Sequence, residues 1–275
     1  MEYPKVSIIT VVYNGVDHIE KSILNVLKQT YPNFEYVVVD GGSTDGTLDV
    51  ILRYGDRLVW VSEPDTGIYD AMQKGAELAT GEWILFRNCG DYFINPTAIE
   101  DLFKQYNEDK GEDFLLANTR YFKEYGYKDI KPGILNKSYF DAMPVNHPAT
   151  FIRRKTQLKY PFHLEYKNSA DYCFFVEAFS HGATYRYFDI LVSLFDNETG
   201  ASSDNYDRSI KENIDFLTKA GASGDRITQL KQSLKKYKIK RRIKSLVPFY
   251  SLYHRWHLKN EGWTQCDIHT ILKDI

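Results

Sequence analysis

The stretch SEPDTGIYDAMQKGAELATGEWILFRNCGDYF, from Ser62 to Phe93, is the part of the sequence that decides the fold. One apolar stripe recurs at helical spacing within it, formed by Ile68, Ala71, Met72, Gly75, Ala76, Leu78 and Ala79. Asp65 and Thr66 can cap the first turn of this helix, and Gly81 lies where the helix would end. The apolar run WILF that follows is typical of a strand buried in a parallel sheet. The stretch therefore predicts a loop, a helix, a tight turn and a buried strand.

Asn88, Cys89, Gly90 and Asp91 come immediately after that predicted strand. Ligands of open α/β sheets bind beyond the carboxyl ends of the strands, so Asp91 lies where chemistry is expected. A carboxylate there can hold a divalent cation against a diphosphate, because hard cations take oxygen ligands. Asp and Asn also terminate strands and cap helices in many proteins, and that is the structural alternative for each such residue.

Strands and helices alternate through the first 95 residues. Strands are expected over residues 5–12, 34–39, 57–61 and 83–86, and helices over residues 17–29 and 48–54. Asp40 follows the second of these strands, and the turn-rich loop GGSTDGT comes directly after it. Alternation at this pace predicts an α/β fold with a Rossmann-like, mostly parallel sheet and helices on both faces.

The pattern changes after Asp91. Helices are expected over residues 96–106 and 170–179, strands over residues 114–122, 149–152 and 184–194, and an irregular segment over residues 126–143. Further helices, over residues 204–218, 226–242 and 245–258, predict a C-terminal helical extension. We therefore divide the chain into a domain at residues 1–203, with halves at 1–95 and 96–203, and an extension at residues 204–275.

The extension is strongly basic. Eleven Lys or Arg and no Asp or Glu lie within residues 226–260, and because the whole chain has a formal net charge of −2, the remainder carries −13. Such asymmetry supports a division near residue 225. An acidic globule repels polyanions, so nucleic acid is not an expected partner.

Composition excludes several classes of protein. No apolar run approaches the roughly 18 residues of a membrane-spanning helix. The N-terminus starts a strand almost at once, without the charged and apolar regions of a signal peptide. The cysteines are scattered and odd in number, so they indicate neither a disulfide framework nor a zinc site. We expect a cytoplasmic protein.

The loop at residues 41–47 matches neither of two common phosphate-binding glycine motifs. No Gly-Lys-Ser/Thr follows it, as a Walker loop requires, and G-x-G-x-x-G is absent. From spacing alone, the sequence predicts a nucleotide-binding α/β domain and does not specify a reaction.

Four segments in order, VSIITVVYNG, VVVDGGSTDGT, EPDTGIYDAMQKGAELATGEWI and NCGDYF, resemble the family 2 glycosyltransferases with the GT-A fold. The subgroup they resemble makes bacterial surface polysaccharides, and the resemblance covers residues 5–200. It implies a nucleotide-sugar donor, a divalent metal and inversion at the anomeric carbon.

The resemblance places the donor site at the strand ends. Thr10, Tyr13 and Asn14 match residues beside the base, and Asp40 matches the carboxylate that contacts uracil or ribose. Lys74 is the nearest cation for the diphosphate. The other donor-side positions are Gly42, Ser43, Asp65 and Asn88.

The acidic metal motif departs from the family pattern. Many relatives read Asp-x-Asp-Asp there, whereas this chain keeps a single carboxylate, Asp91. The resemblance still implies Mn²⁺ or Mg²⁺ as the cofactor, with the ion held mainly by the diphosphate.

Two segments of the second half also match the family. NHPATFIRR, at residues 146–154, makes His147 a candidate for contact with the diphosphate or the acceptor. NSADYCFF, at residues 168–175, resembles the segment that bears the catalytic base, with Asp171 at the matching position. The structural alternatives are a hydrogen-bonding histidine and an acid in the first turn of a helix.

The resemblance therefore implies an inverting glycosyltransferase that moves a sugar from a UDP-sugar to a glycan or lipid-linked acceptor in bacterial polysaccharide biosynthesis. A nucleotidyltransferase is a second hypothesis, but it would need a cation in the loop after the first strand, and VVYNG has none. A non-catalytic sugar-nucleotide binding module is a third, because the metal motif is depleted.

The basic segment at residues 226–260 joins cations to large apolar residues. Ile227, Leu230, Leu234 and Tyr237 can share one helical face. Helices of this kind bind anionic lipid, so we expect a peripheral position on the inner face of the plasma membrane. The alternatives are that the helices pack on the acidic domain or form a homodimer.

Overall fold

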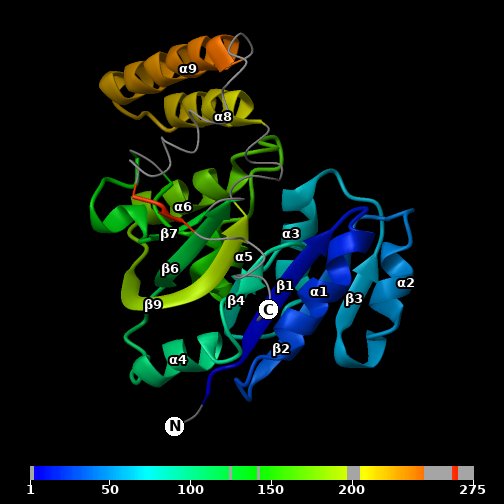
Figure 1. Cartoon of the computed structure of the whole chain (residues 1–275). Coiled ribbons are helices and arrows are strands. Elements are labelled where there is room, and N and C mark those ends of the chain that lie inside the picture. Colours follow the sequence, from blue (N-terminus) through cyan, green and yellow to red (C-terminus); the bar gives the residue numbers. More distant parts are fainter. Residues whose placement is uncertain (1–2, 124–125, 141–142, 197–204, 245–261, 266–275) are drawn as a thin grey trace.

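The structure is a computed structural model that describes residues 3–123, 126–140, 143–196, 205–244 and 262–265. One ten-stranded sheet forms its centre, and helices cover both faces of this sheet (Figure 1).

The first half of the sheet is parallel. β1 (Val6–Val12) lies between β2 (Phe34–Asp40) and β4 (Trp83–Phe86), and β3 (Val59–Ser62) extends the sheet beyond β2. The connecting helices are α1 (Val16–Leu27), α2 (Thr47–Leu52) and α3 (Ile68–Leu78), with the 3₁₀ turn η1 (Gly55–Arg57) before β3. Because these strands are parallel, their carboxyl ends and the following loops share one edge of the sheet.

The second half of the sheet is mixed. β8 (Thr150–Arg153) is antiparallel to β4 and to β6 (Phe114–Lys123), and β9 (Tyr185–Asp196) runs parallel to β6. Three shorter strands complete it, namely β5 (Tyr92–Phe93) beside β9, β7 (Gly126–Ile130) beside β6, and β10 (Thr264–Gln265) beside β7. The strand order is therefore β10-β7-β6-β8-β4-β1-β2-β3, with β5 and β9 off this path.

The remaining helices belong to the second half and to the extension. They are α4 (Ala98–Gln105), α5 (Arg154–Lys159), α6 (Ala170–Ser180), α8 (Tyr206–Lys219) and α9 (Gly224–Lys244), with the 3₁₀ turns η2 (Gly133–Leu135) and η3 (His147–Ala149). The helices α8 and α9 lie side by side at one end of the molecule (Figure 1). Within the described part of the chain, none of the helices has both the length and the apolar character needed to cross a membrane.

The alternation of strands and helices predicted for the first half of the domain is confirmed, with each element close to its expected place. The prediction of an irregular segment over residues 126–143 is wrong for residues 126–130, which form β7. The sequence GYKDI has a weak strand pattern by itself, and pairing with β6 supplies the hydrogen bonds that hold it. The helix expected over residues 245–258 lies outside the described residues.

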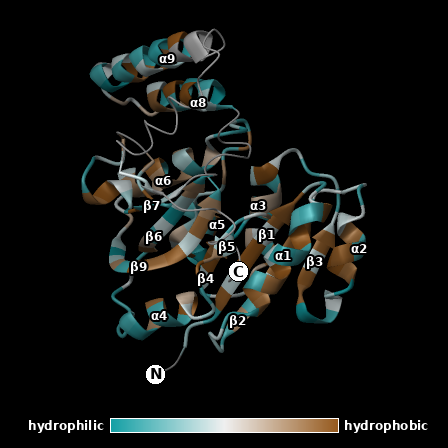
Figure 2. Cartoon of the chain, viewed as in Figure 1, coloured by the Kyte–Doolittle hydropathy of each residue, from teal (hydrophilic) through white to brown (hydrophobic). Residues whose placement is uncertain are grey.

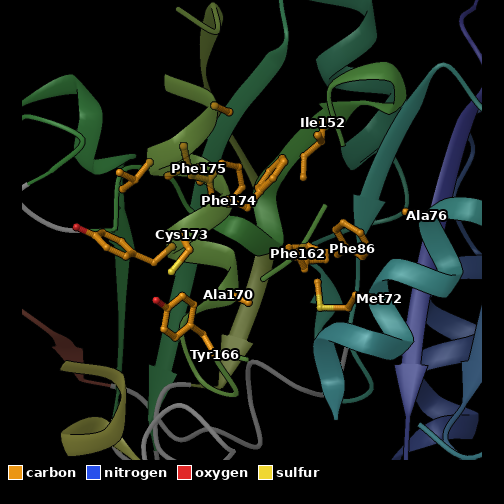
Figure 3. Close-up of a cluster of buried hydrophobic side chains, with 14 of the residues drawn as sticks. Met72, Ala76, Phe86, Ile152, Phe162, Tyr166, Ala170, Cys173, Phe174 and Phe175 are labelled. Carbon is orange, nitrogen blue, oxygen red and sulfur yellow. The ribbon is translucent and has the colours of Figure 1, made fainter. Parts of the chain in front are cut away.

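Buried side chains form two large clusters on the two faces of the sheet. One cluster includes residues of α1, α2 and α4, and the other includes residues of α3, α6, α8 and α9. In the second cluster the rings of Phe86, Phe162, Phe174 and Phe175 follow one another in contact (Figure 3). This aromatic row joins the end of β4, in the first half of the sheet, to α6, which belongs to the second half of the domain.

The apolar face predicted within residues 226–242 is present and is covered by protein. Leu230 is buried in the same cluster as α6, and Leu234 packs against that cluster. The ring of Tyr237 lies 4.7 Å from the ring of Tyr206 on α8. Much of the rest of α9 is hydrophilic (Figure 2). Packing on the domain, which the sequence left open, therefore accounts for the apolar side of α9.

Helix α3 packs closely against β1. Its buried residues are Ala71, Met72, Gly75 and Ala76. An added Cβ at Gly75 would lie 2.5 Å from Cγ2 of Ile9, so the helix can approach the strand this closely only with glycine there. The stripe prediction is wrong for Ile68 and Leu78, which are 37% and 41% exposed. Ile68 faces a cavity and not the sheet.

The turn between α3 and β4 is held by Glu35 of β2. Its carboxylate accepts hydrogen bonds from the N–H groups of Thr80 at 2.6 Å and Gly81 at 3.2 Å, and it pairs with Lys5 at 2.6 Å. Burial alone would raise the pKa of Glu35, but the hydrogen bonds from Lys5, Ser7 and Thr80 outweigh it and lower the pKa to about 2. The helix itself ends at Leu78, so Gly81 serves this turn and not the helix end.

We expect Gly81→Ala to destabilise the protein by about 1–3 kcal/mol, the usual cost of inserting a group into a packed site. An added Cβ would lie 2.6 Å from Oγ of Ser7 and 2.8 Å from the backbone oxygen of Lys5. Urea denaturation followed by circular dichroism measures the free energy of unfolding. Gly224→Ala is the matched control, because an added Cβ there meets no atom within 4 Å. Equal stability of the two variants would contradict this account of the turn.

Candidate active site

A cavity of about 280 Å³ lies beyond the carboxyl end of β4, where the two halves of the sheet meet. Its apolar wall includes Ile68, Met72 and Phe86. The polar side chains that line it are those of Tyr69, Asn88, Asp91, Tyr121, His147, Lys167, Asn168 and Asp171. The fold therefore brings together four residues singled out in the sequence, namely Asn88, Asp91, His147 and Asp171.

Asp171 stands in the first turn of α6, with 24% of its side chain exposed. Its Oδ1 accepts hydrogen bonds from the hydroxyl of Tyr69 and the N–H of Tyr172, both at 2.8 Å. Its Oδ2 lies 3.5 Å from Nδ1 of His147. Burial alone would raise the pKa of Asp171, but His147, Tyr69 and the backbone outweigh it and hold the pKa below its usual value. Asp171 is therefore ionised at neutral pH and fixed in direction.

His147 links Asp171 to the aromatic row. Its ring packs edge-on against Phe86 and Phe175, with centroids 5.4 Å away in each case, and only 11% of the side chain is exposed. While Nδ1 faces Asp171, Nε2 is buried and has no hydrogen-bond partner in the described part of the chain. Because a buried polar atom without a partner is costly, Nε2 is a ready contact for a polar group bound in the cavity.

Asp91 is only 8% exposed, and its N–H donates to the carbonyl of Asn88 at 2.9 Å. Burial raises the pKa of its carboxyl to about 6, although the nearby charges of Arg87 and His147 oppose this rise. Arg87 is completely buried, donates to Oγ of Ser193 at 2.6 Å, and stacks 4.1 Å from the ring centre of Phe93. A buried guanidinium therefore stands near the single acid of the motif.

The groups beside Asp91 suit a hard divalent cation. Oδ1 of Asn88 is buried without a partner among the described residues, and it lines the same cavity as the Asp91 carboxylate. Mg²⁺ is commonly held by one or two carboxylates together with substrate phosphates. Within residues that the structure describes, no group of three or more His, Cys, Asp or Glu side chains is placed to hold a metal. The donor set therefore fits an ion shared with a diphosphate, and not one held by the protein alone.

Two loops at the ends of β1 and β2 are tied together by hydrogen bonds. Asn14, at φ 48°, accepts from the N–H of Thr44 at 2.9 Å, and its own N–H donates to Oγ of Ser43 at 2.7 Å. Asp40 is fully buried and accepts from the N–H of Ser43 at 3.1 Å and from Oγ of Ser62 at 2.6 Å. These bonds fix the loops that carry most of the predicted donor residues.

The loop after β3 meets the same two loops through Asp65. A Cβ added at Gly41 would collide with the Asp65 carboxylate and would lie 3.5 Å from Cβ of Tyr13. Tyr13 itself is 64% exposed, so its ring is free to contact a ligand. The backbone at Gly42 takes φ +79° and passes close to Pro64. Tyr13, Asn14, Asp40, Gly42, Ser43 and Asp65 thus form one continuous edge at the ends of β1, β2 and β3, and the residues that line the cavity are others.

Two of the predicted donor residues are engaged elsewhere. The Thr10 side chain is completely buried, donates to the carbonyl of Arg87 at 2.6 Å and accepts from Tyr36 at 2.9 Å. Lys74 pairs with Glu63 at 2.8 Å and donates to the carbonyl of Pro64 at 3.1 Å. Because these bonds already engage both side chains, we leave both residues out of the proposed donor site.

Three cavity residues were not found from the sequence. Tyr69 bonds to Asp171 from 102 positions away. Burial, and then the charges of Asp91 and Asp171, raise the pKa of Tyr121 to about 12. Lys167 stands four positions before Asp171 and brings a cation to the cavity. Two of the three had a usable local signal, since Tyr69 lies within the matched segment EPDTGIYDAMQKGAELATGEWI and Lys167 directly precedes NSADYCFF.

Solved glycosyltransferases share this fold. S. aureus TarS 1–349 in complex with UDP aligns with a TM-score of 0.61 and 20% identity, covering 82% of this chain and 69% of that chain. The mannosyltransferase PcManGT from Pyrobaculum calidifontis, in complex with GDP-Man and Mn²⁺, aligns with a TM-score of 0.64 and 18% identity, covering 82% and 66%. The GT-A fold expected from the sequence is confirmed.

Residues 7–185 match the family model described as Glycosyl transferase family 2, and the chain belongs to that family. It is therefore a glycosyltransferase. A PGL/p-HBAD biosynthesis glycosyltransferase of Mycobacterium tuberculosis is 29% identical to it over 231 residues, which covers 80% of this chain and 88% of that protein.

Proposed function

We propose that this glycosyltransferase inverts the anomeric carbon as it moves a sugar from a UDP-sugar to a hydroxyl of a glycan or lipid-linked acceptor in bacterial polysaccharide biosynthesis. The observation that carries the proposal is one cavity holding an ionised, oriented Asp171 together with the oxygen ligands of Asn88 and Asp91. A base for the acceptor hydroxyl and oxygen ligands for a diphosphate-bound ion in one cavity suit direct displacement of the diphosphate by the acceptor.

Asp171 takes the proton from the acceptor hydroxyl as that oxygen bonds to the anomeric carbon. The bond from this carbon to the diphosphate oxygen breaks at the same time, and its electron pair leaves with the nucleoside diphosphate. Tyr69 and the Tyr172 N–H both hold Oδ1 at 2.8 Å, whereas Oδ2 faces Nδ1 of His147 at 3.5 Å, so Oδ2 is the oxygen better placed to receive the proton. A positioned base of this kind is worth about 10²–10⁴-fold in rate.

Asn88 and Asp91 would hold a divalent cation on the diphosphate side. When bound, Mn²⁺ or Mg²⁺ stabilises the charge that develops on the leaving diphosphate. The complex of PcManGT contains Mn²⁺, which supports the same cofactor class here. Arg87 stands near Asp91 and favours the ionised carboxylate that a cation requires.

The nucleoside would lie along the edge formed by Tyr13, Asn14, Asp40, Gly42, Ser43 and Asp65. The bound UDP of TarS supports a uridine donor. Asp40 is fully buried and accepts from Ser43 and Ser62, so its part is to hold this edge in place for the base or ribose.

Two other hypotheses are weaker. A nucleotidyltransferase needs a cation after the first strand to grip a triphosphate, and the loop after β1 offers Tyr13, Asn14 and Gly15 instead. A non-catalytic binding module would not require a carboxylate held ionised in the cavity by hydrogen bonds from two residues. Sugar transfer by the purified enzyme separates this last hypothesis from the main one.

We also propose that α9 binds an anionic membrane surface and so brings the enzyme to a lipid-linked acceptor, with the rest of the protein in the cytoplasm. Lys231, Lys235, Lys236 and Lys238 are exposed on α9, and Ile239 beside them is 50% exposed. Each such cation adds about 1 kcal/mol on an anionic membrane. The homodimer suggested by the sequence stays an untested prediction.

We expect Asp171→Asn to abolish sugar transfer and to leave UDP affinity nearly unchanged, because the amide keeps the shape and cannot accept the proton. Transfer is measured from a panel of UDP-sugars, and affinity by calorimetry. Asp56→Asn, an exposed acid on η1, is the matched control. More than about a tenth of wild-type turnover in Asp171→Asn would place a base worth 10²–10⁴-fold at another residue.

We expect Asp91→Asn to weaken UDP binding chiefly when Mn²⁺ is present. Asparagine keeps the size of the side chain, so no cavity opens. The substitution removes the negative charge that faces the nearby buried Arg87. Calorimetric titration with UDP in Mn²⁺ and in chelator measures both affinities. Equal losses under the two conditions would mean that Asp91 supports the fold and not the ion.

We expect a variant with glutamine at residues 231, 235, 236 and 238 to sediment poorly with anionic liposomes while its melting temperature is unchanged. Substitution is preferable to truncation, since Leu230 of α9 belongs to the core. The control replaces the exposed lysines 104, 110, 155 and 159 and so removes the same charge. If both variants sediment like the wild type, α9 is not the membrane contact.

A further inference from the structure

Among the described residues, Lys167 is the one Lys or Arg whose side chain lines the cavity. Its Nζ donates to the backbone carbonyl of Thr66 at 2.8 Å. Its Cδ lies 3.8 Å from the position of a Cβ added at Gly67. The side chain therefore crosses from the segment before α6 to the loop before α3, and it spans the boundary between the two halves of the protein.

The ammonium of Lys167 is only partly used. Its one hydrogen-bond acceptor is a neutral carbonyl, and no Asp or Glu within the described residues lies in ion-pair distance of it. An ammonium has three N–H donors, so two remain for a ligand while the bond to Thr66 is kept. Lys74 differs in this respect, because its ammonium already forms an ion pair with Glu63 and a hydrogen bond to the carbonyl of Pro64.

The backbone around Lys167 is held in place by the extension. Glu212 of α8 accepts hydrogen bonds from the N–H groups of Lys167 at 3.1 Å and Asn168 at 2.8 Å. Glu212 is itself paired with Arg208 at 2.9 Å. A long side chain with a fixed backbone and a tethered tip loses little freedom on binding, which favours its use as a ligand contact.

The negative charges in the cavity favour a cation at this position. Asp91 and Asp171 both line it, and a nucleoside diphosphate would add further negative charge. The depleted metal motif supplies one carboxylate, so the protein by itself would contribute little negative charge to holding an ion there. The leaving diphosphate gains charge as its bond to the sugar breaks, and a donor already in place stabilises that charge without reorganisation.

We propose that Lys167 binds the diphosphate of the sugar donor and stabilises the departing nucleoside diphosphate. This inference rests on the proposed function and adds a residue to it. The anomeric carbon–oxygen bond breaks with its electron pair on the diphosphate. Lys167 stays protonated and donates hydrogen bonds to the phosphate oxygens, so the proton of the reaction still goes to Asp171.

Calorimetric titration of the full chain with uridine, UMP and UDP tests this assignment, in chelator and in Mn²⁺. We expect Lys167→Met to weaken UDP binding about 10- to 100-fold in chelator, the range for losing a hydrogen bond between charged groups. Uridine affinity should not change, UMP should lose less than UDP, and Lys167→Arg should keep most of the affinity. Lys211→Met, an exposed lysine of α8, is the matched control.

Unchanged UDP affinity in Lys167→Met would overturn the assignment, and so would equal losses for uridine and UDP, which would indicate a distorted site. A loss in Lys74→Met with none in Lys167→Met would return the role to the cation chosen from the sequence. If the wild type binds no nucleoside diphosphate, including GDP, the proposed donor site and this inference both fail. If the wild type binds UDP and Lys167→Met binds it with the same affinity, this inference fails and the proposed donor site stands.

Discussion

The structure depends on strand β4, which in the described part of the chain is the hydrogen-bonded link between the two halves of the sheet. It pairs in parallel with β1 and antiparallel with β8. All four of its side chains are buried, and the turn before it passes so close to β1 that only glycine fits at residue 81. The loop after β4 is therefore delivered to the place where both halves converge. The cavity forms there because α3, η3 and α6 can all reach that point.

Charge organises this cavity once the fold has formed it. The two acids line one cavity, but their surroundings differ. Hydrogen bonds from His147, Tyr69 and the backbone lower the pKa of Asp171, whereas burial raises the pKa of Asp91 to about 6 against the opposing charge of Arg87. Environments that give two carboxyl groups different pKa values commonly accompany a division of roles, and we propose a base and a cation ligand here.

Helix α8 of the extension helps to position the residues that line the cavity. Glu212 holds the backbone of Lys167 and Asn168, and the hydroxyl of Tyr166 donates to Asp215 at 2.7 Å. Both acids belong to α8, so the segment leading to Asp171 is supported from the extension. The domain boundary placed at residue 204 from the expected helices, and the division near residue 225 suggested by the charge distribution, both stay predictions. The packing nevertheless shows that the basic helix α9 joins the core through Leu230, while Lys231, Lys235, Lys236 and Lys238 are exposed.

The sequence alone determined the alternating strands and helices of the first half, the buried strand WILF, and the motifs that led to Asp91 and Asp171. These features are local, because a helix, a strand and a short motif each have a fixed spacing along the chain. Tertiary structure alone decided that Tyr69 bonds to Asp171, that Arg87 stands near Asp91, and that Lys167 lines the cavity while Thr10 and Lys74 bond elsewhere. It also made a strand of residues 126–130 and turned Ile68 toward the cavity. Such contacts join residues as far as 102 positions apart, and the burial that shifts their pKa values exists only after packing has excluded water.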